Sequence, residues 1–290
     1  MSQFSIKDIE HLTGIRAHTL RIWEQRYNLP KPKRTTGNIR YYDDSDLRLL
    51  LNISMLNQHG HKISSISRMS AQEISVIAVN LSLSSSNQSM HIQSLVTSML
   101  DFDERSFEKV IGSSVLQYGL EGTMMEVVFP FMGMIGVLWQ TGTLDPAYEH
   151  FISALLRQKL IVAIDGQEHK LRSDARNFLL FLPEGEFHEL GLLFANYIIR
   201  SSGHRTLYLG TNLPLVDLEQ ISSKYRVDVL FTSMTTAFAR PVSNGFVQEL
   251  KAKFPKSVLL LTGRYFLEQT EEYPEGVHLV KSPNDLRRFF

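Results

Sequence analysis

Glu186 and His188 stand two residues apart where the chain leaves an apolar stretch. Residues 177–182 read NFLLFL, and the segment PEGEFHELG follows directly. A carboxylate two residues before a histidine can accept a hydrogen bond from one ring nitrogen and leave the other for a metal. Gly191, at the end of the segment, allows something large to approach the backbone closely. The spacing therefore predicts that His188 binds a metal and that Glu186 supports it.

The elements around this segment predict a parallel sheet. Residues 176–290 contain five short apolar runs separated by amphipathic helices, a pattern typical of a parallel sheet with helices on both faces. Ligands of such sheets bind beyond the carboxyl ends of the strands. We therefore expect a Rossmann-like domain over residues 175–290, with its binding site at the His188 segment.

Glu186-x-His188-x-x-Gly191 resembles the Asp-x-His-x-x-Gly motif of cobalamin-binding domains. In that family the histidine replaces the cofactor's own base below cobalt, and imidazole suits such a metal. The resemblance thus implies that His188 is a cobalt ligand.

The same resemblance implies a serine about forty residues further on and a pair of glycines after the next strand, which make room for the nucleotide tail of the cofactor. Ser233 and Gly263 match this pattern, whereas Thr235 stands for the usual leucine and Thr262 for the first glycine. A side chain at Thr262 could narrow the slot for the tail. The interpretation as a cobalamin site therefore stands beside a second one, in which only the fold is retained.

Composition separates a basic amino-terminal segment from an acidic remainder. The 290 residues have zero net charge, but residues 1–70 hold 11 Lys and Arg against 6 Asp and Glu. This split is typical of a nucleic-acid-binding arm attached to a sensing or assembly domain. There is no cysteine, which excludes disulfides and thiolate metal sites.

The chain shows neither a signal peptide nor a membrane span. Its most apolar window, residues 127–139, has only 13 residues and contains a proline, which is too short to cross a bilayer. We expect a cytoplasmic protein that does not bind membranes.

Residues 5–28 predict a helix-turn-helix, with Ser5 capping the first helix and the second running from about Ala17 to Tyr27. Residues 29–42 contain two prolines and a Gly-Asn pair, which favour a basic hairpin, or wing. Asp43 and Ser45 then cap a further helix that ends at Gly60. The candidate DNA-binding residues lie on the second helix and the wing: Arg16, His18, Thr19, Arg21, Arg26, Tyr27, Lys31, Lys33, Arg34, Arg40 and Tyr41.

The stretch TLRIWEQRYNLPKPKRTTGNIRYY resembles the MerR family of winged-helix regulators, over about residues 4–70. The resemblance implies double-stranded operator DNA as a partner, with arginine reading bases in the major groove and wing residues contacting phosphates. MerR-type regulators bind as dimers, so it also implies a homo-oligomer, a dimer or a tetramer.

Residues 90–165 show only helical periodicity, broken at Gly119, Pro130 and Gly142, which favours a four-helix bundle. Residues 134–153, MIGVLWQTGTLDPAYEHFIS, resemble the helical cap of cobalamin-dependent regulators. In that family a tryptophan packs over the upper face of adenosylcobalamin, and an acid and a histidine help to define the pocket. The matching residues are Trp139, Glu149 and His150.

The light-sensing members of that family place a histidine directly after the tryptophan, where it can take the upper cobalt position once light has removed the adenosyl group. Gln140 stands there in this chain. An amide is a poor cobalt ligand, so the illuminated state cannot be locked in the same way unless His150 substitutes.

Together the segments predict a multi-domain chain of α and α/β class. A winged helix-turn-helix over residues 1–75 and a helical bundle cap over 76–167 precede the Rossmann-like domain, with polar seams at 81–89 and 165–174. We predict a transcriptional regulator, a repressor controlled by adenosylcobalamin and light. Two alternatives remain: a cofactor-independent MerR-type regulator that uses its carboxyl-terminal domains for assembly and partner binding, and a cobalamin-dependent methyltransferase or mutase component.

Overall fold

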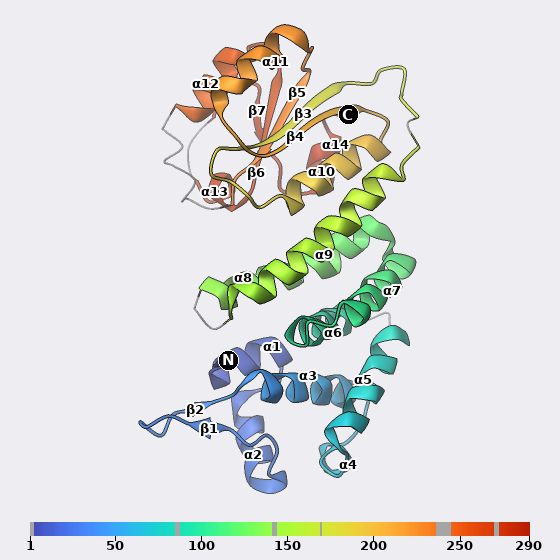
Figure 1. Cartoon of the computed structure of the whole chain (residues 1–290), viewed down its shortest axis with the longest axis vertical. Helices are drawn as coiled ribbons and strands as arrows, with labels where there is room; N and C mark the ends of the chain where they lie inside the picture. The colour runs from blue at the N-terminus through green and yellow to red at the C-terminus, as the bar shows by residue number, and fades with distance from the viewer. Residues whose placement is uncertain (1–2, 85–87, 141–143, 169, 236–244, 270–272) are drawn as a thin grey trace. The chain divides into compact units, whose positions relative to one another are not determined.

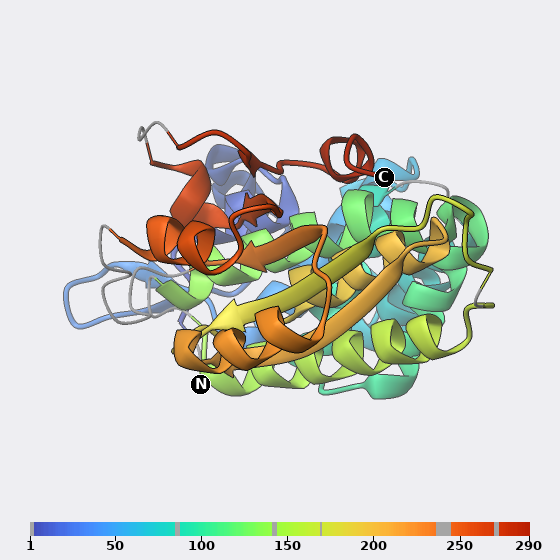
Figure 2. The same ribbon diagram turned by 90° about the horizontal axis from the view of Figure 1, so that it is seen from above.

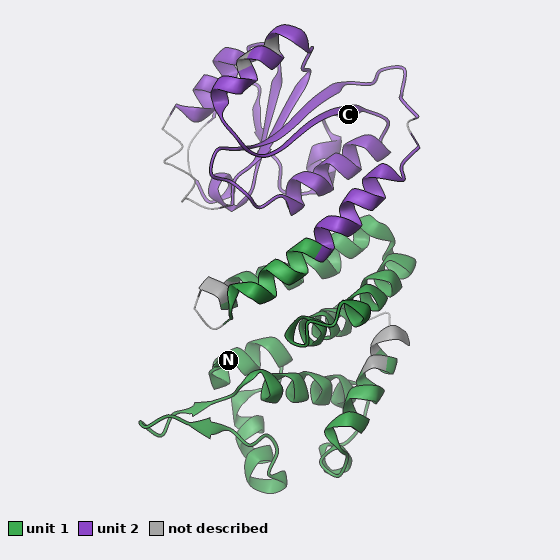
Figure 3. Cartoon of the chain, viewed as in Figure 1, with its two compact units in different colours: residues 1–154 green, residues 155–290 purple. Residues whose placement is uncertain are grey.

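The computed structural model describes residues 3–84, 88–140, 144–168, 170–235, 245–269 and 273–290. The chain divides into two compact units, residues 1–154 and 155–290 (Figure 3). The boundary falls inside a helix, so the predicted division into three domains stays a prediction. No helix in the described ranges combines the length and the apolar character needed to cross a membrane.

The first unit begins with the predicted helix-turn-helix (Figure 1). Helix α1 (Ile6–Thr13) starts with a capping box in which the Ser5 side chain accepts from the backbone of Asp8 and the Asp8 side chain accepts in return. The helix ends at Gly14, whose φ of 72° lies in the left-handed region that favours glycine. Helix α2 (Ala17–Tyr27) follows with Leu20 and Trp23 buried.

The wing is a short antiparallel hairpin of β1 (Lys33–Arg34) and β2 (Arg40–Tyr41), with Lys33 opposite Tyr41. Helix α3 (Asp44–Gln58) comes next, and Asp43 caps it with a second capping box. Ser45, which we expected to share this role, lies inside the first turn instead, where its hydroxyl donates to Asp43 Oδ1 at 2.6 Å.

Further helical elements follow α3 in the described residues. They are α4 (Ile63–Ile66), α5 (Ala71–Ser84), α6 (Gln88–Leu100), α7 (Glu104–Thr123) with the π-helical turn η1 (Met124–Val128), α8 (Phe129–Gln140) and α9 (Pro146–Asp165). The predicted break at Gly119 is a kink in α7, with φ 70° and ψ 172°. Pro130 does not end the helical run, but it directly follows the π-helical turn η1 and Phe129, so the backbone leaves α geometry just before the residue that lacks an N–H. Gly142 lies outside the described residues.

The serine-rich stretch 81–89 is more helical than its composition suggested. Helix α5 continues to Ser84 and α6 begins at Gln88, so the described part of this seam is helix. Replacing alanine by serine in a helix costs only roughly 0.5 kcal/mol per residue, and packing of the flanking residues outweighs this loss of helix propensity. The described residues of the second seam, 166–168 and 170–176, are irregular, as expected.

The second unit holds a five-stranded parallel sheet, whose strands can be followed in Figures 1 and 2. Its strands are β3 (Asn177–Pro183), β4 (Arg205–Leu213), β5 (Val229–Ser233), β6 (Val258–Thr262) and β7 (Val277–Leu279). They pair in the order β4-β3-β5-β6-β7. The predicted five strands and their parallel pairing are confirmed.

Helices cover both faces of this sheet. On one face the strands pack against α11 (Leu218–Lys224) and α12 (Phe246–Lys253). Helix α10 (Leu190–Ser201) packs against β3 and β4 away from these two helices and also contacts α14 (Pro283–Arg287). The core on the α11 and α12 side includes Leu179, Phe181, Leu218, Leu230, Leu250, Phe254, Leu259 and Leu261. Because β3 is the first strand and lies between β4 and β5, the strand order reverses between β3 and β5. Their carboxyl ends therefore form the switch point at which such sheets bind ligands.

Candidate functional site

The loop after β3 is organised by the buried carboxylate of Glu186, which has no exposed surface. Its Oε1 accepts hydrogen bonds from the backbone N–H groups of Phe187 and His188, both at 2.9 Å. Its Oε2 accepts one at 2.6 Å from the backbone N–H of Thr235, beyond the end of β5. The carboxylate thus ties together the two loops that flank the switch point.

This environment keeps Glu186 ionised. Burial raises the pKa of the carboxyl, but hydrogen bonds from the His188 ring, the backbone of Thr235 and the backbone of His188 outweigh it and lower the pKa to about 2. A charged buried acceptor surrounded by donors holds its neighbours strongly.

The His188 imidazole is held by Glu186 and is about half exposed. Its Nδ1 lies 2.6 Å from Glu186 Oε1, and the side chain is 53% exposed. A carboxylate only accepts, so Nδ1 carries the proton and Nε2 is the nitrogen with which the ring would bind a metal. One imidazole backed by one carboxylate fits a metal that arrives with its other ligands already held in a chelating cofactor.

Gly191 lies in the first turn of α10, three residues after this histidine. Among the described residues, a Cβ built on it would meet no atom within 4 Å beyond its chain neighbours and the backbone of its own helix. Protein packing therefore does not require glycine here, although glycine costs about 1 kcal/mol relative to alanine inside a helix. The open space fits a bound group that packs on the backbone, as cobalamin would.

The candidate tail residues belong to the neighbouring strands. Ser233 ends β5 and is only 6% exposed, and Gly263 follows β6 with a φ of 91°. A Cβ on Gly263 would lie 2.3 Å from the backbone oxygen of Met234, so this glycine is required by the protein itself. The hydroxyl of Thr262 donates to the Val280 carbonyl at 2.6 Å. Contacts inside the sheet unit thus explain both the glycine at position 263 and the threonine at position 262.

A second glutamate, Glu189, ties down the other end of the His188 loop. Its Oε2 lies 2.6 Å from Nε of Arg157 on α9, and its Oε1 accepts at 2.8 Å from the hydroxyl of Tyr208 on β4. Burial, and the hydrogen bond to Glu189, raise the pKa of Tyr208 well above its usual value, so it stays a donor. Sequence reasoning missed all three residues, although Glu189 stands beside His188 in the chain.

The predicted cap residues lie in the first unit. Glu149 is in the first turn of α9, where its Oε2 lies 3.1 Å from Nδ1 of the exposed His150 and its Oε1 accepts from Ser153. Trp139 and Gln140 are in α8, but their side chains lie outside what the structure describes. The structure joins Glu149 to His150, and the role of the three residues stays a prediction.

Basic side chains line the exposed face of α2. Arg16, His18, Arg21 and Arg26 are exposed, while Thr19 and Tyr27 are half-buried. The Arg26 guanidinium lies over the Tyr27 ring, 5.8 Å from its centroid. This face presents positive charge and hydrogen-bond donors of the kind that a helix in the major groove needs.

The wing adds exposed cations at Lys31, Lys33 and Arg34, beside the half-buried Tyr41. Three of the predicted phosphate contacts, Lys33, Arg34 and Arg40, also pair with acidic side chains, Arg34 with Glu24 at 3.8 Å. Lys33 pairs with Asp43, the cap of α3, and Arg40 pairs with Glu24 on α2, with 2.9 Å between Nε and Oε2. Glu24 was not predicted, and it joins the wing to the helix.

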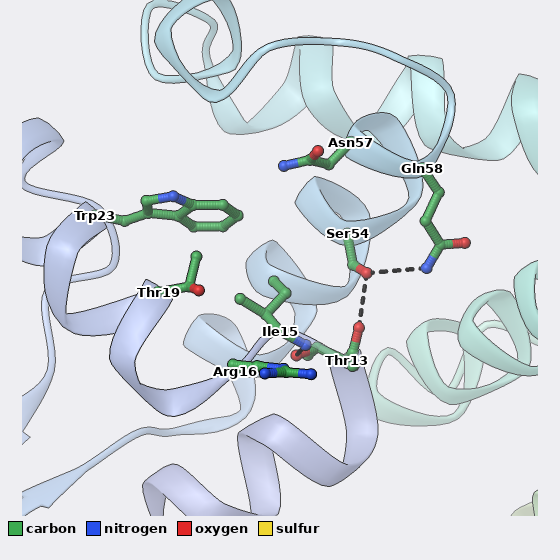
Figure 4. Close-up of a pocket in the computed structure, with 9 residues that line it drawn as sticks. Thr13, Ile15, Arg16, Thr19, Trp23, Ser54, Asn57 and Gln58 are labelled. Carbon is green, nitrogen blue, oxygen red and sulfur yellow. Dashed lines mark hydrogen bonds between the residues drawn. The ribbon is translucent and has the colours of Figure 1, made fainter.

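A cavity of about 320 Å³ lies beside α2, between the helix-turn-helix turn and the end of α3 (Figure 4). The Ser54 hydroxyl donates to the Thr13 carbonyl at 2.7 Å, and the Gln58 amide donates to Ser54 at 3.2 Å. These bonds hold the turn against α3. Arg16 and Thr19 line the same cavity, so it belongs to the candidate DNA-binding face.

Two segments of the chain match known families. Residues 4–73 match the model of the MerR HTH family regulatory protein, and residues 91–177 match the model of the B12 binding domain. The chain is a MerR-type regulator with a B12 binding domain. The first match covers the helix-turn-helix and the wing, and the second covers α7, α8 and α9 in full.

Two relatives are similar to most of this MerR-type regulator. The HTH-type transcriptional repressor CarH of Myxococcus xanthus is 28% identical over 295 residues, covering 98% of this chain and 97% of CarH. The HTH-type transcriptional repressor CarA of the same organism is 26% identical, covering 81% of this chain and 77% of CarA. The prediction of a transcriptional regulator is confirmed by these relatives.

A solved structure, the monomethylamine corrinoid protein of Methanosarcina barkeri, is 12% identical, with a TM-score of 0.44. The match covers 76% of this MerR-type regulator and 97% of the corrinoid protein.

Proposed function

We propose that this regulator represses transcription and that adenosylcobalamin, held through His188, and light control its binding to operator DNA. The winged helix of the first unit would bind the operator, with Arg21 among the base-reading residues. The sheet unit would bind the cofactor. The names of CarH and CarA, both repressors, support the direction of regulation.

One observation carries the proposal. A half-exposed imidazole is oriented by a fully buried carboxylate, and that carboxylate bridges β3 and β5 at the switch point of the sheet. A surface histidine without a ligand would not need such support. The open space beside Gly191 is the second feature that fits a large flat cofactor.

Each residue would have a distinct role toward the cofactor. His188 would bind cobalt through Nε2, Glu186 would hold the proton on Nδ1, and Ser233 and Gly263 would border the nucleotide tail. Trp139, Glu149 and His150 would shape the upper pocket. When bound, the cofactor would supply a cobalt–carbon bond that light can break.

Control of DNA binding would follow from linkage. A ligand shifts an assembly equilibrium only when it binds the two assembly states with different affinity. A dimer or tetramer holds several winged helices together, so it engages several half-sites at once and gains avidity. Loss of the assembly on illumination would therefore lower operator occupancy.

The test measures assembly mass by light scattering and operator affinity by fluorescence anisotropy. Both are measured for the free protein, for the protein loaded with adenosylcobalamin in the dark, and for the loaded protein after green light. We expect a larger assembly and tighter operator binding only in the loaded, dark state. Equal mass and affinity in all three states would overturn the proposal.

A cofactor-independent regulator is the second candidate, and the contacts of Gly263 and Thr262 favour it. Both residues are explained by the sheet unit's own backbone, Gly263 through Met234 and Thr262 through Val280. In that case the sheet unit would serve assembly alone. The His188→Ala variant separates the two candidates, because only the first predicts a change in operator binding.

A further inference from the structure

Glu189 stands directly after His188, so the position of its backbone affects where the proposed cobalt ligand lies. Glu189 precedes the first residue of α10 and is half-buried. Both of its carboxylate oxygens are engaged by side chains from other elements, Arg157 of α9 and Tyr208 of β4. These partners are 32 and 19 residues away along the chain, so the contact belongs to the tertiary fold.

The loop is consequently anchored on both sides of the histidine. Before it, Glu186 accepts from the Thr235 backbone, which ties the loop to β5. After it, Glu189 ties the loop to β4 and α9. A ligand held between two fixed points loses less freedom when it binds a metal, and its approach direction is set in advance.

Strand β4 is shaped where it meets Glu189. The pairing of β3 and β4 shifts register after Leu180, and Gly210 has a φ of 76°. Such a shift bends a strand and re-aims the side chains beside it. A Cβ on Gly210 would lie 3.8 Å from Glu189 Oε1 and 3.9 Å from the Tyr208 ring. The irregularity therefore lies at the point where Tyr208 reaches the glutamate.

Arg157 links this network to the helix that carries the candidate cap pair. Glu149, Ser153 and Arg157 follow one another on α9 at intervals of four residues, which places them along one face of the helix. The Ser153 hydroxyl donates to Glu149, which continues the polar row toward Arg157. Glu189, the residue next to His188, is therefore bound by Arg157 of the same helix that carries Glu149 and His150.

We propose that Glu189, held by Arg157 and Tyr208, is a positioning residue for His188 in cobalamin binding. Glu189 itself does not contact cobalt. It fixes the carboxyl-terminal side of the loop so that the His188 ring approaches the metal in one direction, and Arg157 makes this position depend on α9. The inference rests on the proposed function, because it requires that His188 binds the cofactor.

The variants Glu189→Gln, Arg157→Gln and Tyr208→Phe test it, together with the double variant Arg157→Gln/Glu189→Gln. The exposed pair Arg264 and Glu268, at 2.7 Å in the same unit, supplies the matched controls Arg264→Gln and Glu268→Gln. Two quantities are measured in the dark: the dissociation constant of adenosylcobalamin, and the absorption bands that report whether a histidine nitrogen binds cobalt. Thermal unfolding of the cofactor-free variants reports the fold.

We expect Glu189→Gln to weaken adenosylcobalamin binding about 10-fold or more, the size typical when a group that orients a metal ligand is removed. The spectrum should shift toward the form without histidine ligation, while the cofactor-free variant unfolds near the wild-type temperature. The double variant Arg157→Gln/Glu189→Gln should bind adenosylcobalamin no more weakly than the weaker-binding of its two single variants, because both changes break the same ion pair. The control variants should match the wild type.

Two outcomes would overturn the inference. One is a Glu189→Gln variant with wild-type affinity and a wild-type histidine-ligated spectrum. The other is weakened binding in proportion to a loss of thermal stability, with the spectrum of the bound fraction unchanged, which would assign Glu189 a role in folding only. A wild-type protein that binds no cobalamin would instead overturn the proposed function, so the two failures are distinguishable.

Discussion

The backbone N–H of Thr235 donates a 2.6 Å hydrogen bond to Oε2 of Glu186 and thereby joins the loops after β5 and β3. The same carboxylate holds the His188 ring at 2.6 Å through its other oxygen. One buried acid therefore connects the candidate metal ligand to the neighbouring strand. Its removal should affect both the fold and the histidine.

Glu186→Gln should lower the free energy of unfolding of the cofactor-free protein at pH 7 by about 2 kcal/mol, since an amide cannot accept all the hydrogen bonds that the carboxylate accepts. Chemical unfolding followed by circular dichroism measures the difference. Glu268→Gln, an exposed change in the same unit, serves as the control. Equal stability of the wild type and Glu186→Gln would contradict the role given to the carboxylate.

The same residue predicts how stability depends on pH. The Glu186 pKa falls from an ordinary value of 4.5 to about 2 in the folded chain. A carboxyl group whose pKa is lowered by folding stabilises the fold above its ordinary pKa and loses this contribution as the pH falls toward its folded pKa. Between pH 4.5 and 2, the wild type should lose roughly 3 kcal/mol that Glu186→Gln does not lose. Parallel stability curves of the two proteins over this range would contradict the assignment.

Arg21 and Lys31 should differ in what they contribute to operator binding. Arg21 is exposed on α2, so Arg21→Ala should cost about 1–3 kcal/mol on the operator and reduce discrimination against altered sites. Lys31 is exposed beside the wing, so Lys31→Ala should weaken binding to all sequences alike and reduce the salt dependence by about one phosphate contact. Anisotropy titrations at several salt concentrations measure both effects. Lys256→Ala, at an exposed position in the second unit, should change neither, and identical behaviour of Arg21→Ala and Lys31→Ala would refute the distinction.

The pairing of Arg40 with Glu24 predicts that positive charge alone does not suffice in the wing. Arg40→Lys keeps the charge but loses the two-point contact, at 2.9 and 3.4 Å, with the Glu24 carboxylate. We expect operator affinity to fall about 5-fold, which corresponds to about 1 kcal/mol. Glu24→Gln should have a similar effect, and the double variant should be no worse than either. Additive losses would show that Arg40 acts on DNA alone.

Gln140 predicts the behaviour of the illuminated protein. Because an amide is a poor cobalt ligand, the spectrum after green light should lack the signature of two imidazole ligands in the wild type. Gln140→His should introduce that signature. If the wild type already has it, His150→Ala should abolish it, which would assign the second imidazole to His150. A two-imidazole spectrum that survives His150→Ala would contradict this interpretation of both positions.

Local patterns predicted the elements, and tertiary contacts escaped prediction. Ser5 and Asp43 predict the starts of their helices because each side chain accepts a hydrogen bond from the backbone N–H three residues later. His188 was placed correctly at a strand end because an apolar run precedes it. By contrast, Glu186 accepts a hydrogen bond from Thr235, 49 residues away along the chain, and no local pattern indicates a contact between residues so far apart.

The same limit explains the residues that were missed. Glu189 looked like one more polar residue before a helix, because its partners Arg157 and Tyr208 come from other elements. Arg40 looked like a phosphate contact, because charge alone does not show that Glu24 faces it. The helical end of α5 at Ser84 shows a related limit, since serine content describes propensity and not packing.

The most direct test of the central claim is the visible absorption spectrum of the purified wild type and His188→Ala after incubation with adenosylcobalamin in the dark and desalting. His278→Ala, which changes an exposed histidine of the same unit, is the control. We predict that the wild type and His278→Ala retain the cofactor with the bands of histidine-ligated cobalt, and that His188→Ala loses these bands. A colourless wild type, or a His188→Ala variant with the wild-type spectrum, would contradict the claim that His188 holds cobalamin in this regulator.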